Sequence, residues 1–135
     1  MHQKRHVFEF MTRNVYTATP ETSLRELTAQ LVKRRATAAP ILDHEGSLVG
    51  LVALADIAVD ALAHPDTTER QAQHVMQRRV FTVGQEVDLS TAVEHLRKHR
   101  VHRLVVTEGD RVVGVISCLD VLDALTEVFG YSPFL

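Results

Sequence analysis

Two related stretches are the strongest indication of the fold: GLVALADI at residues 50–57 and GVISCLDV at residues 114–121. Both begin with glycine and carry aspartate at the seventh position, 64 residues apart. Upstream the offset is 65, and the same agreement continues there. The matching pairs are Met11 with Met76, Val15 with Val80, Thr17 with Thr82, Glu21 with Glu86, Leu24 with Leu89, Leu31 with Leu96 and Arg35 with Arg100. Matches at apolar positions and at polar, charged and glycine positions indicate the duplication of one structural unit.

Each copy contains the same series of predicted elements: an extended run, an amphipathic helix, a hairpin and a closing helix. Ser23 and Glu26 form a capping box at the start of the first amphipathic helix, and Asp88 is the predicted N-cap of the second. The extended runs are 14–19 and 80–84, the hairpins join 40–42 to 48–53 and 104–107 to 112–116, and the closing helices are 54–63 and 118–128.

This pattern predicts an α+β fold in which each repeat has the order β-α-β-β-α. We expect repeat one at about 7–63, a polar linker at about 64–70 and repeat two at about 71–128, all within a single module spanning 1–135. A unit of about 55 residues buries both helices and its sheet poorly when alone. The two repeats are therefore expected to pack through their sheets with pseudo-two-fold symmetry.

The composition is that of a soluble globular protein, with 45% hydrophobic and 24% charged residues. The single cysteine, Cys118, cannot form an internal disulfide, which fits a reducing cytoplasm. No run approaches the roughly 20 apolar residues of a membrane span, and the polar start favours no signal peptide. The formal net charge of -2 gives no reason to expect nucleic acid as the main partner. We predict a cytoplasmic protein.

The sequence resembles the CBS domain pair, or Bateman module, from about residue 7 to residue 124. The segments that carry the resemblance are Val75-Met76, VHRLVV at 101–106 and above all GVISCLDV at 114–121, which resembles the family's Gly-φ-x-Ser/Thr-x-x-Asp/Asn-φ signature. The second repeat is also similar to the last repeat of the AMP-activated protein kinase gamma subunit. The family resemblance implies two clefts between stacked repeats, which often hold AMP, ADP, ATP, S-adenosylmethionine or another adenosyl ligand.

The resemblance also implies roles for individual residues. Asp120 would receive the ribose hydroxyls, Ser117 would lie near ribose or phosphate, and His102 and Arg103 would face the phosphates. The whole implied ligand-binding set is Asp120, Ser117, His102, Arg103, Asp56, Thr37, Ala38 and Val101. The chemistry agrees, since a carboxylate accepts from two vicinal hydroxyls and a guanidinium suits phosphate oxygens. A helix beginning at Ser117 would add an N-terminus that attracts anions.

A structural alternative accounts for the same residues. Ser117 and Asp120 also suit a capped helix N-terminus. Ala53 occupies the matching cap position of the first repeat and offers no side-chain cap. On that ground Asp56 is slightly better explained by a ligand. The missing hydroxyl also weakens the first cleft, so we expect one good site at Asp120 and a degraded or empty one at Asp56.

Other clusters have simpler explanations. His95, His99 and His102 share helical spacing, but they lack a completing cysteine or carboxylate, so no metal site is predicted. The basic runs 33–35 and 97–100 fall near helix ends, where cations are favourable, although they also suit phosphates. Cys118 is expected to be inert and partly buried. No catalytic motif is present, so no enzyme activity and no required cofactor are predicted.

The leading hypothesis is a stand-alone sensing module that binds an adenosyl ligand and acts on an unknown target protein. The alternative is an interaction module with empty clefts that mediates dimerisation or docking. The resemblance implies a homodimer in either case. The apolar segment 129–135 is predicted to pack on the domain or on a partner subunit.

Overall fold

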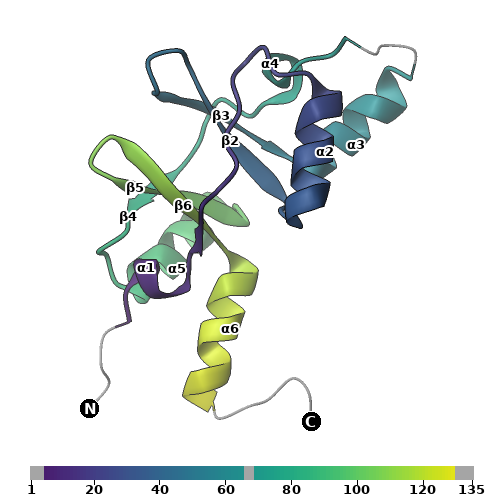
Figure 1. The fold of residues 1–135 in the computed structure, drawn as a ribbon. Coiled ribbons are helices and arrows are strands. Elements are labelled where there is room, and N and C mark those ends of the chain that lie inside the picture. The colour runs from purple at the N-terminus through teal and green to yellow at the C-terminus, as the bar shows by residue number, and fades with distance from the viewer. Residues whose placement is uncertain (1–4, 66–68, 130–135) are drawn as a thin grey trace. The chain divides into compact units, whose positions relative to one another are not determined.

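A computed structural model describes residues 5–65 and 69–129, which divide into two compact units (Figure 1). Unit 2 is the continuous segment Val15–Val80, whereas unit 1 combines Met1–Asn14 with Phe81–Leu135. Both units mix helices and strands, which confirms the α+β class. Each unit is described here by itself.

Unit 2 is built around an antiparallel hairpin of β2 (Ala38–Leu42) and β3 (Leu48–Ala53). α2 (Leu24–Arg34) precedes the hairpin, and α3 (Leu54–Ala63) and the one-turn α4 (Ala72–Val75) follow it. Single bridges extend the hairpin on both sides, from Ala18 to Ile41 and from Gln77 to Leu51. The hairpin and the closing helix therefore confirm the sequence prediction for this repeat.

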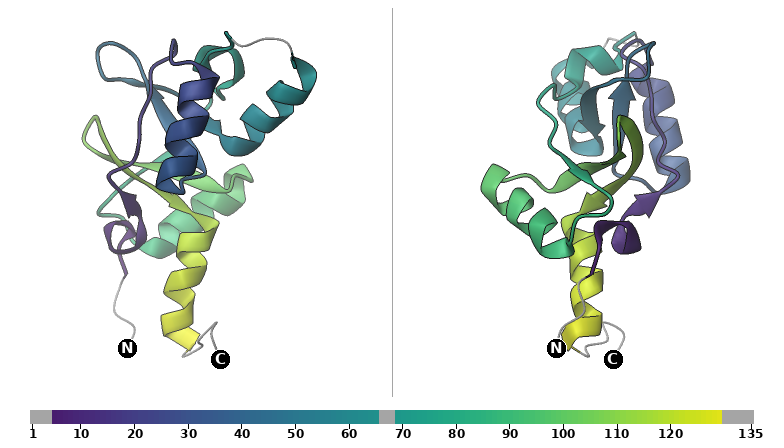
Figure 2. Two further views of the ribbon diagram at one scale, coloured as in Figure 1. Left: turned by 45° about the vertical axis from the view of Figure 1, so that its right-hand side comes forward. Right: turned by 90° about the vertical axis from the view of Figure 1, so that its left-hand side faces the viewer.

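Unit 1 repeats this plan with longer strands. Its sheet has the order β1-β6-β5-β4, in which β4 runs parallel to β5 and the other pairs are antiparallel. The hairpin of β5 and β6 leads directly into α6, as both views of Figure 2 show. The elements are α1 (Val7–Phe10), β1 (Thr12–Arg13), β4 (Thr82–Gly84), α5 (Leu89–His99), β5 (Arg103–Glu108), β6 (Arg111–Ser117) and α6 (Cys118–Phe129).

Local sequence signals set both ends of the amphipathic helices. Ser23 Oγ accepts from the Glu26 backbone N at the start of α2, and Asp88 accepts from the Thr91 backbone N at the start of α5. Both N-caps were predicted. At the other ends Arg35 and Arg100 adopt the left-handed conformation, with φ of 55° and 53°, and close the last turns with backbone hydrogen bonds.

Each unit has its own hydrophobic core, formed where the amphipathic helix covers the hairpin. Leu31 and Leu96 occupy equivalent places in α2 and α5, as the repeat predicts. The buried core of unit 2 consists of Ala18, Leu27, Leu31, Ala39, Ile41, Val52, Ala72 and Met76. The buried core of unit 1 consists of Val7, Met11, Val83, Ala92, Leu96, Leu104, Val106, Ile116 and Val121.

The segment before the first repeat's helix differs from its prediction. The extended run expected at 14–19 contains only a single bridge at Ala18, and Asn14 takes a left-handed φ of 53°. The strand lies earlier, at β1, and pairs with β6 of the second repeat. The compact units therefore divide the chain differently from the sequence repeats, because each lead-in segment packs with elements of the other repeat.

Candidate functional site

The unit 1 site is the set of His102, Arg103, Ser117 and Asp120, where the β5–β6 hairpin meets α6. Arg103 and Ser117 are directly opposite each other in the antiparallel ladder. The backbone N of Cys118 donates to the His102 carbonyl at 2.9 Å. Four residues that the sequence predicted to act together are thus brought to one end of the unit 1 sheet.

Ser117 and Asp120 hold each other in place. Asp120 Oδ2 accepts from the Ser117 backbone N at 2.8 Å and from Ser117 Oγ at 3.1 Å, while Ser117 Oγ accepts from the Asp120 backbone N at 3.2 Å. This is a reciprocal capping box at the first turn of α6. The structural alternative for these two residues is therefore confirmed. Both side chains remain half-exposed, so the box does not remove them from solvent.

The other two members differ in exposure. His102 is exposed, and Arg103 is half-buried. Val101, the remaining candidate of this repeat, packs against the core of unit 1, and its backbone N donates to the Leu96 carbonyl at 3.1 Å. Val101 therefore fixes the chain between α5 and the site rather than presenting a polar group.

The unit 2 site has the same backbone frame with different side chains. The Thr37 carbonyl accepts from the Leu54 backbone N at 2.9 Å, and Ala38 lies opposite Ala53 in the ladder. Asp56 Oδ2 accepts from the Ala53 backbone N at 3.0 Å. The Asp56 carboxylate thus caps α3 itself, a structural role that the sequence analysis did not identify, and a ligand role for Asp56 stays a prediction.

The two sites differ in the groups that recognise anions and hydroxyls. Where unit 1 has Arg103 and Ser117, unit 2 has Ala38 and Ala53, both buried. A guanidinium and a hydroxyl are thus replaced by methyl groups at matching ladder positions. The unit 2 site keeps a half-buried aspartate and has the exposed Thr37 in the place of His102, but it lacks the guanidinium and the serine hydroxyl.

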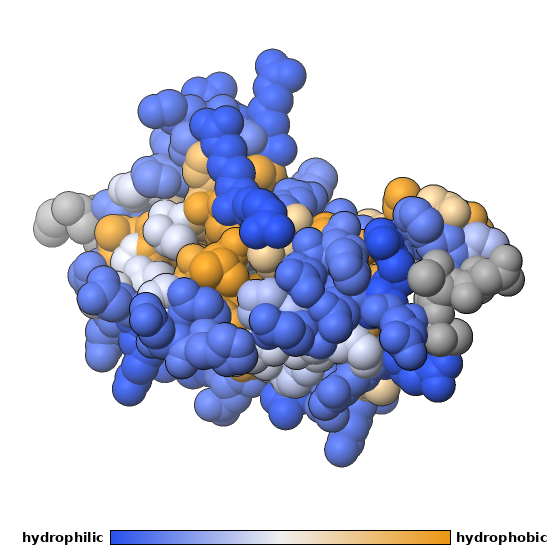
Figure 3. All heavy atoms as spheres, turned by 90° about the horizontal axis from the view of Figure 1, so that it is seen from above, coloured by the Kyte–Doolittle hydropathy of each residue, from blue (hydrophilic) through white to orange (hydrophobic). Residues whose placement is uncertain are grey.

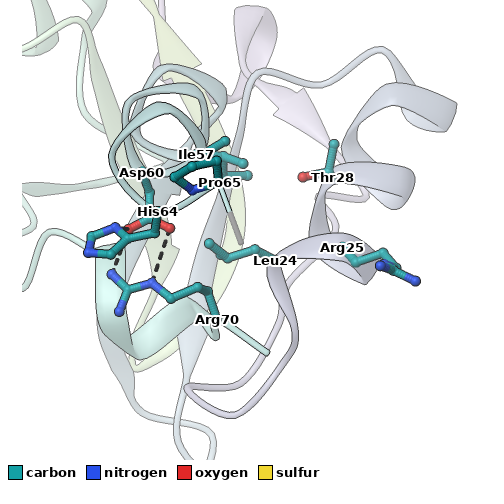
Figure 4. A pocket seen from close by; sticks show the side chains of 9 residues that line it. Leu24, Arg25, Thr28, Ile57, Asp60, His64, Pro65 and Arg70 are labelled. Carbon is teal, nitrogen blue, oxygen red and sulfur yellow. Dashed lines mark hydrogen bonds and ion pairs between the residues drawn. The ribbon is translucent and has the colours of Figure 1, made fainter. Parts of the chain in front are cut away.

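A pocket of about 280 Å3 lies on unit 2, where α2 and α3 meet the chain after α3 (Figure 4). No feature of the sequence predicted this pocket. Its main polar feature is Asp60, which is buried and accepts from Arg70 at 2.6 and 3.2 Å. His64 Nδ1 lies 3.3 Å from Asp60 Oδ1. The lining residues are Leu24, Arg25, Thr28, Ile57, Asp60, Ala61, His64, Pro65 and Arg70.

The ion pair shifts the pKa of both partners. The hydrogen bond from Arg70 is the main cause that lowers the pKa of Asp60 below its ordinary value, against the opposing effect of burial. The same hydrogen bond raises the pKa of Arg70. Unit 1 has an exposed counterpart at its surface, where Arg5 Nη1 lies 2.8 Å from Glu127 Oε2.

The pair predicts an acid-dependent contribution to stability. Because the folded-state pKa of Asp60 is lowered, its contribution is present above the unfolded-state pKa and is lost as pH falls through the folded value. We expect the Tm difference between wild type and Asp60→Asn to shrink on acidification, measured from about pH 6 to about pH 2.5. Glu127→Gln, in the exposed pair, is the control, and its Tm should differ from that of wild type by nearly the same amount at every pH. A Tm difference that stays constant with pH for Asp60→Asn as well would contradict this expectation.

The structure also shows where the histidines, Cys118 and the basic runs considered in the sequence analysis lie. His99 stacks on Phe81 with ring centroids 3.8 Å apart, and His95 meets His99 edge-on at 5.9 Å. Cys118 is exposed, contrary to the prediction of a partly buried thiol, because it starts α6 on the same face as Leu122. The basic runs end α2 and α5 as expected. The apolar tail after Phe129 lies outside the described residues.

Within residues 5–65 and 69–129, no helix has the length and apolar character needed to cross a membrane. No three His, Cys, Asp or Glu side chains of these ranges gather as metal ligands would.

Comparisons with known proteins show the family of this chain. The CBS domain family model matches residues 7–60 and 72–127. A 33.4 kDa protein encoded in a ribosomal RNA operon of Thermofilum pendens is 31% identical over 140 residues, covering 96% of this chain and 46% of that protein. Protein MJ1232 of Methanocaldococcus jannaschii is 29% identical over 118 residues, covering 87% of this chain and 38% of that protein. The chain thus spans less than half the length of these two relatives.

A solved structure shows the same fold with ligands. It is the CBS domain pair of protein MJ0100 in complex with 5'-methylthioadenosine and S-adenosyl-L-methionine. It is 26% identical to this chain with a TM-score of 0.78, and the match covers 89% of this chain and 98% of that one.

Proposed function

This chain belongs to the CBS domain family, and from that premise we propose that it is a regulatory module that binds an adenine nucleotide or another adenosyl ligand at the unit 1 site. Ligand binding would be passed on to a partner protein. The predicted location between the two repeats, the homodimer and the cytoplasmic setting belong to the same proposal. The proposed role of this chain is to sense a ligand, and no catalytic step is proposed for it.

One observation carries the proposal: the hairpin register sets Arg103 opposite Ser117, and Ser117 orients the half-exposed Asp120. Among the described hydrogen bonds, those of Asp120 use Oδ2, so Oδ1 is available to accept from a ribose hydroxyl. Arg103 provides a guanidinium and the exposed His102 an imidazole N–H as donors for phosphate oxygens. The binding of two adenosyl compounds by the CBS domain pair of MJ0100 supports this ligand class.

The unit 2 site is proposed to bind weakly or not at all. Ala38 and Ala53 replace the arginine and the serine, and Asp56 already caps α3 and meets Gln77 Nε2 at 3.4 Å. One ligand per chain, at Asp120, is therefore the expected stoichiometry.

A second candidate function is a ligand-free interaction module. The observation in its favour is that helix capping accounts for both signature aspartates, Asp56 and Asp120. On this account the backbone frame shared by the two sites would serve only to join a hairpin to a helix.

A thermal-shift screen distinguishes the two candidates. The panel is AMP, ADP, ATP, NADH and S-adenosylmethionine, with GTP as the purine control. A ligand at 100 times its Kd should stabilise the chain by about 2.7 kcal/mol, a rise in Tm of several degrees. A rise with an adenine compound and none with GTP supports the sensor. A flat response to the whole panel, repeated by calorimetry, contradicts it and favours the interaction module.

Ligand binding can regulate a partner only through differential affinity. The ligand must bind one arrangement of the chain more tightly than another, since equal affinity shifts no population. The sign of the effect on the partner depends on which arrangement the partner recognises.

A further inference from the structure

The pocket of about 280 Å3 on unit 2 is separate from the proposed ligand site of unit 1. All its lining residues belong to the segment Val15–Val80, so the pocket is formed within unit 2 alone. Its volume lies just below the range of about 300–1,000 Å3 that is typical of sites for drug-sized ligands. The pocket therefore has room for a small organic molecule.

The middle of the pocket is apolar. Figure 4 shows Leu24, Ile57 and Pro65 between two groups of polar residues, and Ala61 of α3 adds a methyl group to the lining. The surface beside the end of α3 is mixed in the same way. In Figure 3 hydrophobic and hydrophilic atoms lie side by side at the right of the view, next to the grey residues that follow α3. Apolar walls with a few polar groups are the usual composition of a small-molecule site.

The polar residues on one side of the pocket satisfy one another. Asp60 is 8% exposed and accepts from Arg70 at 2.6 and 3.2 Å. His64 Nδ1 lies 3.3 Å from Oδ1 of the same carboxylate. A buried carboxylate stays ionised only with partners of this kind. Because Arg70 neutralises Asp60, this side of the pocket offers a ligand no uncompensated negative charge.

The polar residues on the other side have no described partner. Arg25 is exposed and forms no ion pair with a described residue, and the half-buried Thr28 forms no side-chain hydrogen bond with one. They lie three residues apart on α2, which makes their side chains neighbours on one helix face. In Figure 4 the Thr28 hydroxyl is directed toward Ile57 and Pro65, whereas the Arg25 guanidinium is directed away from them. Exposed side chains change rotamer within nanoseconds, so the guanidinium can turn toward the hydroxyl.

We propose that this pocket binds a small monocarboxylate with an aliphatic body. The ligand carboxylate would accept from the Thr28 hydroxyl and from the Arg25 guanidinium, a strong charge-assisted hydrogen bond. The aliphatic body would contact Leu24 and Ile57, which removes apolar surface from water. The proposal does not rest on the proposed function, because no residue of unit 1 takes part.

The charges that line the pocket favour a monocarboxylate over a phosphate. Two arginines and one aspartate line the pocket, so that one positive charge remains when His64 is neutral. A single carboxylate compensates this charge. A phosphate monoester carries about -1.5 to -2 charges at neutral pH and would exceed it.

The first experiment follows the backbone amide resonances of the full chain during titration with hexanoate. We expect saturable shifts at Thr28, Ile57 and Ala61 with a Kd of about 1 mM or lower, and none at Ser117 and Asp120. The controls are 1-hexanol, which has an alkyl chain of similar length without the charge, and hexylamine, which has the opposite charge. Each should bind at least about tenfold more weakly. Equal Kd values for hexanoate and 1-hexanol would overturn the anion preference. A hexanoate Kd above about 10 mM would overturn the site.

The second experiment removes the unpaired charge. Arg25→Gln should raise the Kd of hexanoate at least about fivefold, because the charge-assisted hydrogen bond is lost. Lys33→Gln is the matched control, since it removes the same charge from an exposed position of α2 outside the pocket. Lys33 lies eight residues further along the helix, or about 12 Å, which exceeds the Debye length of about 8 Å at physiological salt. Equal weakening by both variants would show a response to overall charge and would overturn the proposed contact.

The third experiment fills the pocket without changing its charge. Ala61→Leu should abolish saturable binding of hexanoate, because the larger side chain occupies the space of the aliphatic body. Ala58→Leu, at another exposed alanine of α3 that does not line the pocket, should bind hexanoate as wild type does. Circular dichroism confirms that each variant is folded. Binding that persists in Ala61→Leu would place hexanoate elsewhere and overturn the proposal.

Discussion

Replacing Asp120 with alanine is expected to weaken the binding of the adenosyl ligand at least tenfold. The carboxylate would accept from ribose hydroxyls, and a hydrogen bond to a charged group contributes about 1.5–3 kcal/mol. That range corresponds to a loss of roughly tenfold to 150-fold in Kd. The measurement is isothermal calorimetry with the adenine compound that stabilises wild type most.

Asp56→Ala is the matched control for this prediction. Asp120 and Asp56 each accept from the backbone N three residues earlier, at 2.8 and 3.0 Å, so both variants lose an equivalent capping bond. Each loss should cost about 0.5–2 kcal/mol of stability. We expect Asp56→Ala to change Kd less than about threefold, within the usual effect of a surface substitution. Equal losses of affinity would contradict the ranking of the two sites.

The second large effect is expected from Gly114→Ala. A Cβ at Gly114 would lie 2.7 Å from the Thr12 carbonyl oxygen and 2.8 Å from Met11 Sδ. The backbone oxygen belongs to β1, which pairs with β6 at this position, so relief requires the strand to move. Overpacking of this kind costs about 1–3 kcal/mol, and we expect the upper half of that range.

Gly50→Ala is the corresponding change in unit 2. The three atoms nearest to a Cβ there all belong to the Met76 side chain, with Sδ at 2.6 Å and Cγ at 2.9 Å. A flexible thioether adjusts more easily than backbone, so this variant should lose less stability than Gly114→Ala. Urea unfolding gives both values, and amide exchange at Thr12 and Arg13 should rise only in the Gly114 variant. A larger loss from Gly50→Ala would show that β1 contributes little to unit 1.

Local patterns accounted for the elements whose stabilising contacts are close in sequence. The closing helix predicted at 54–63 has those bounds in the structure, and Ser23 and Asp88 cap the two amphipathic helices as expected. The one-turn helices α1 and α4 were missed because four residues are too few to show a helical period.

The candidate site was predicted in part. The sequence identified Ser117 and Asp120 and their link to the hairpin, since the signature and the hairpin are contiguous in the chain. The capping role of Asp56 was missed. A capping box was sought through a side chain at position 53, whereas the aspartate itself accepts from that residue's backbone N. Backbone donors are present at every such position and leave no mark in the sequence.

The duplication, the positions of the long helices and hairpins, and the signature residues of both repeats could all be read from the amino-acid sequence. Only the tertiary structure showed that residues 5–14 pack with the second repeat and that Arg70 neutralises the buried Asp60. It also showed that α3 faces solvent with aliphatic residues alone. The reason is physical: helical period and caps act within a few residues. Strand pairing, ion pairing and burial depend on contacts between residues that are far apart in the sequence, and these contacts form only when the chain folds.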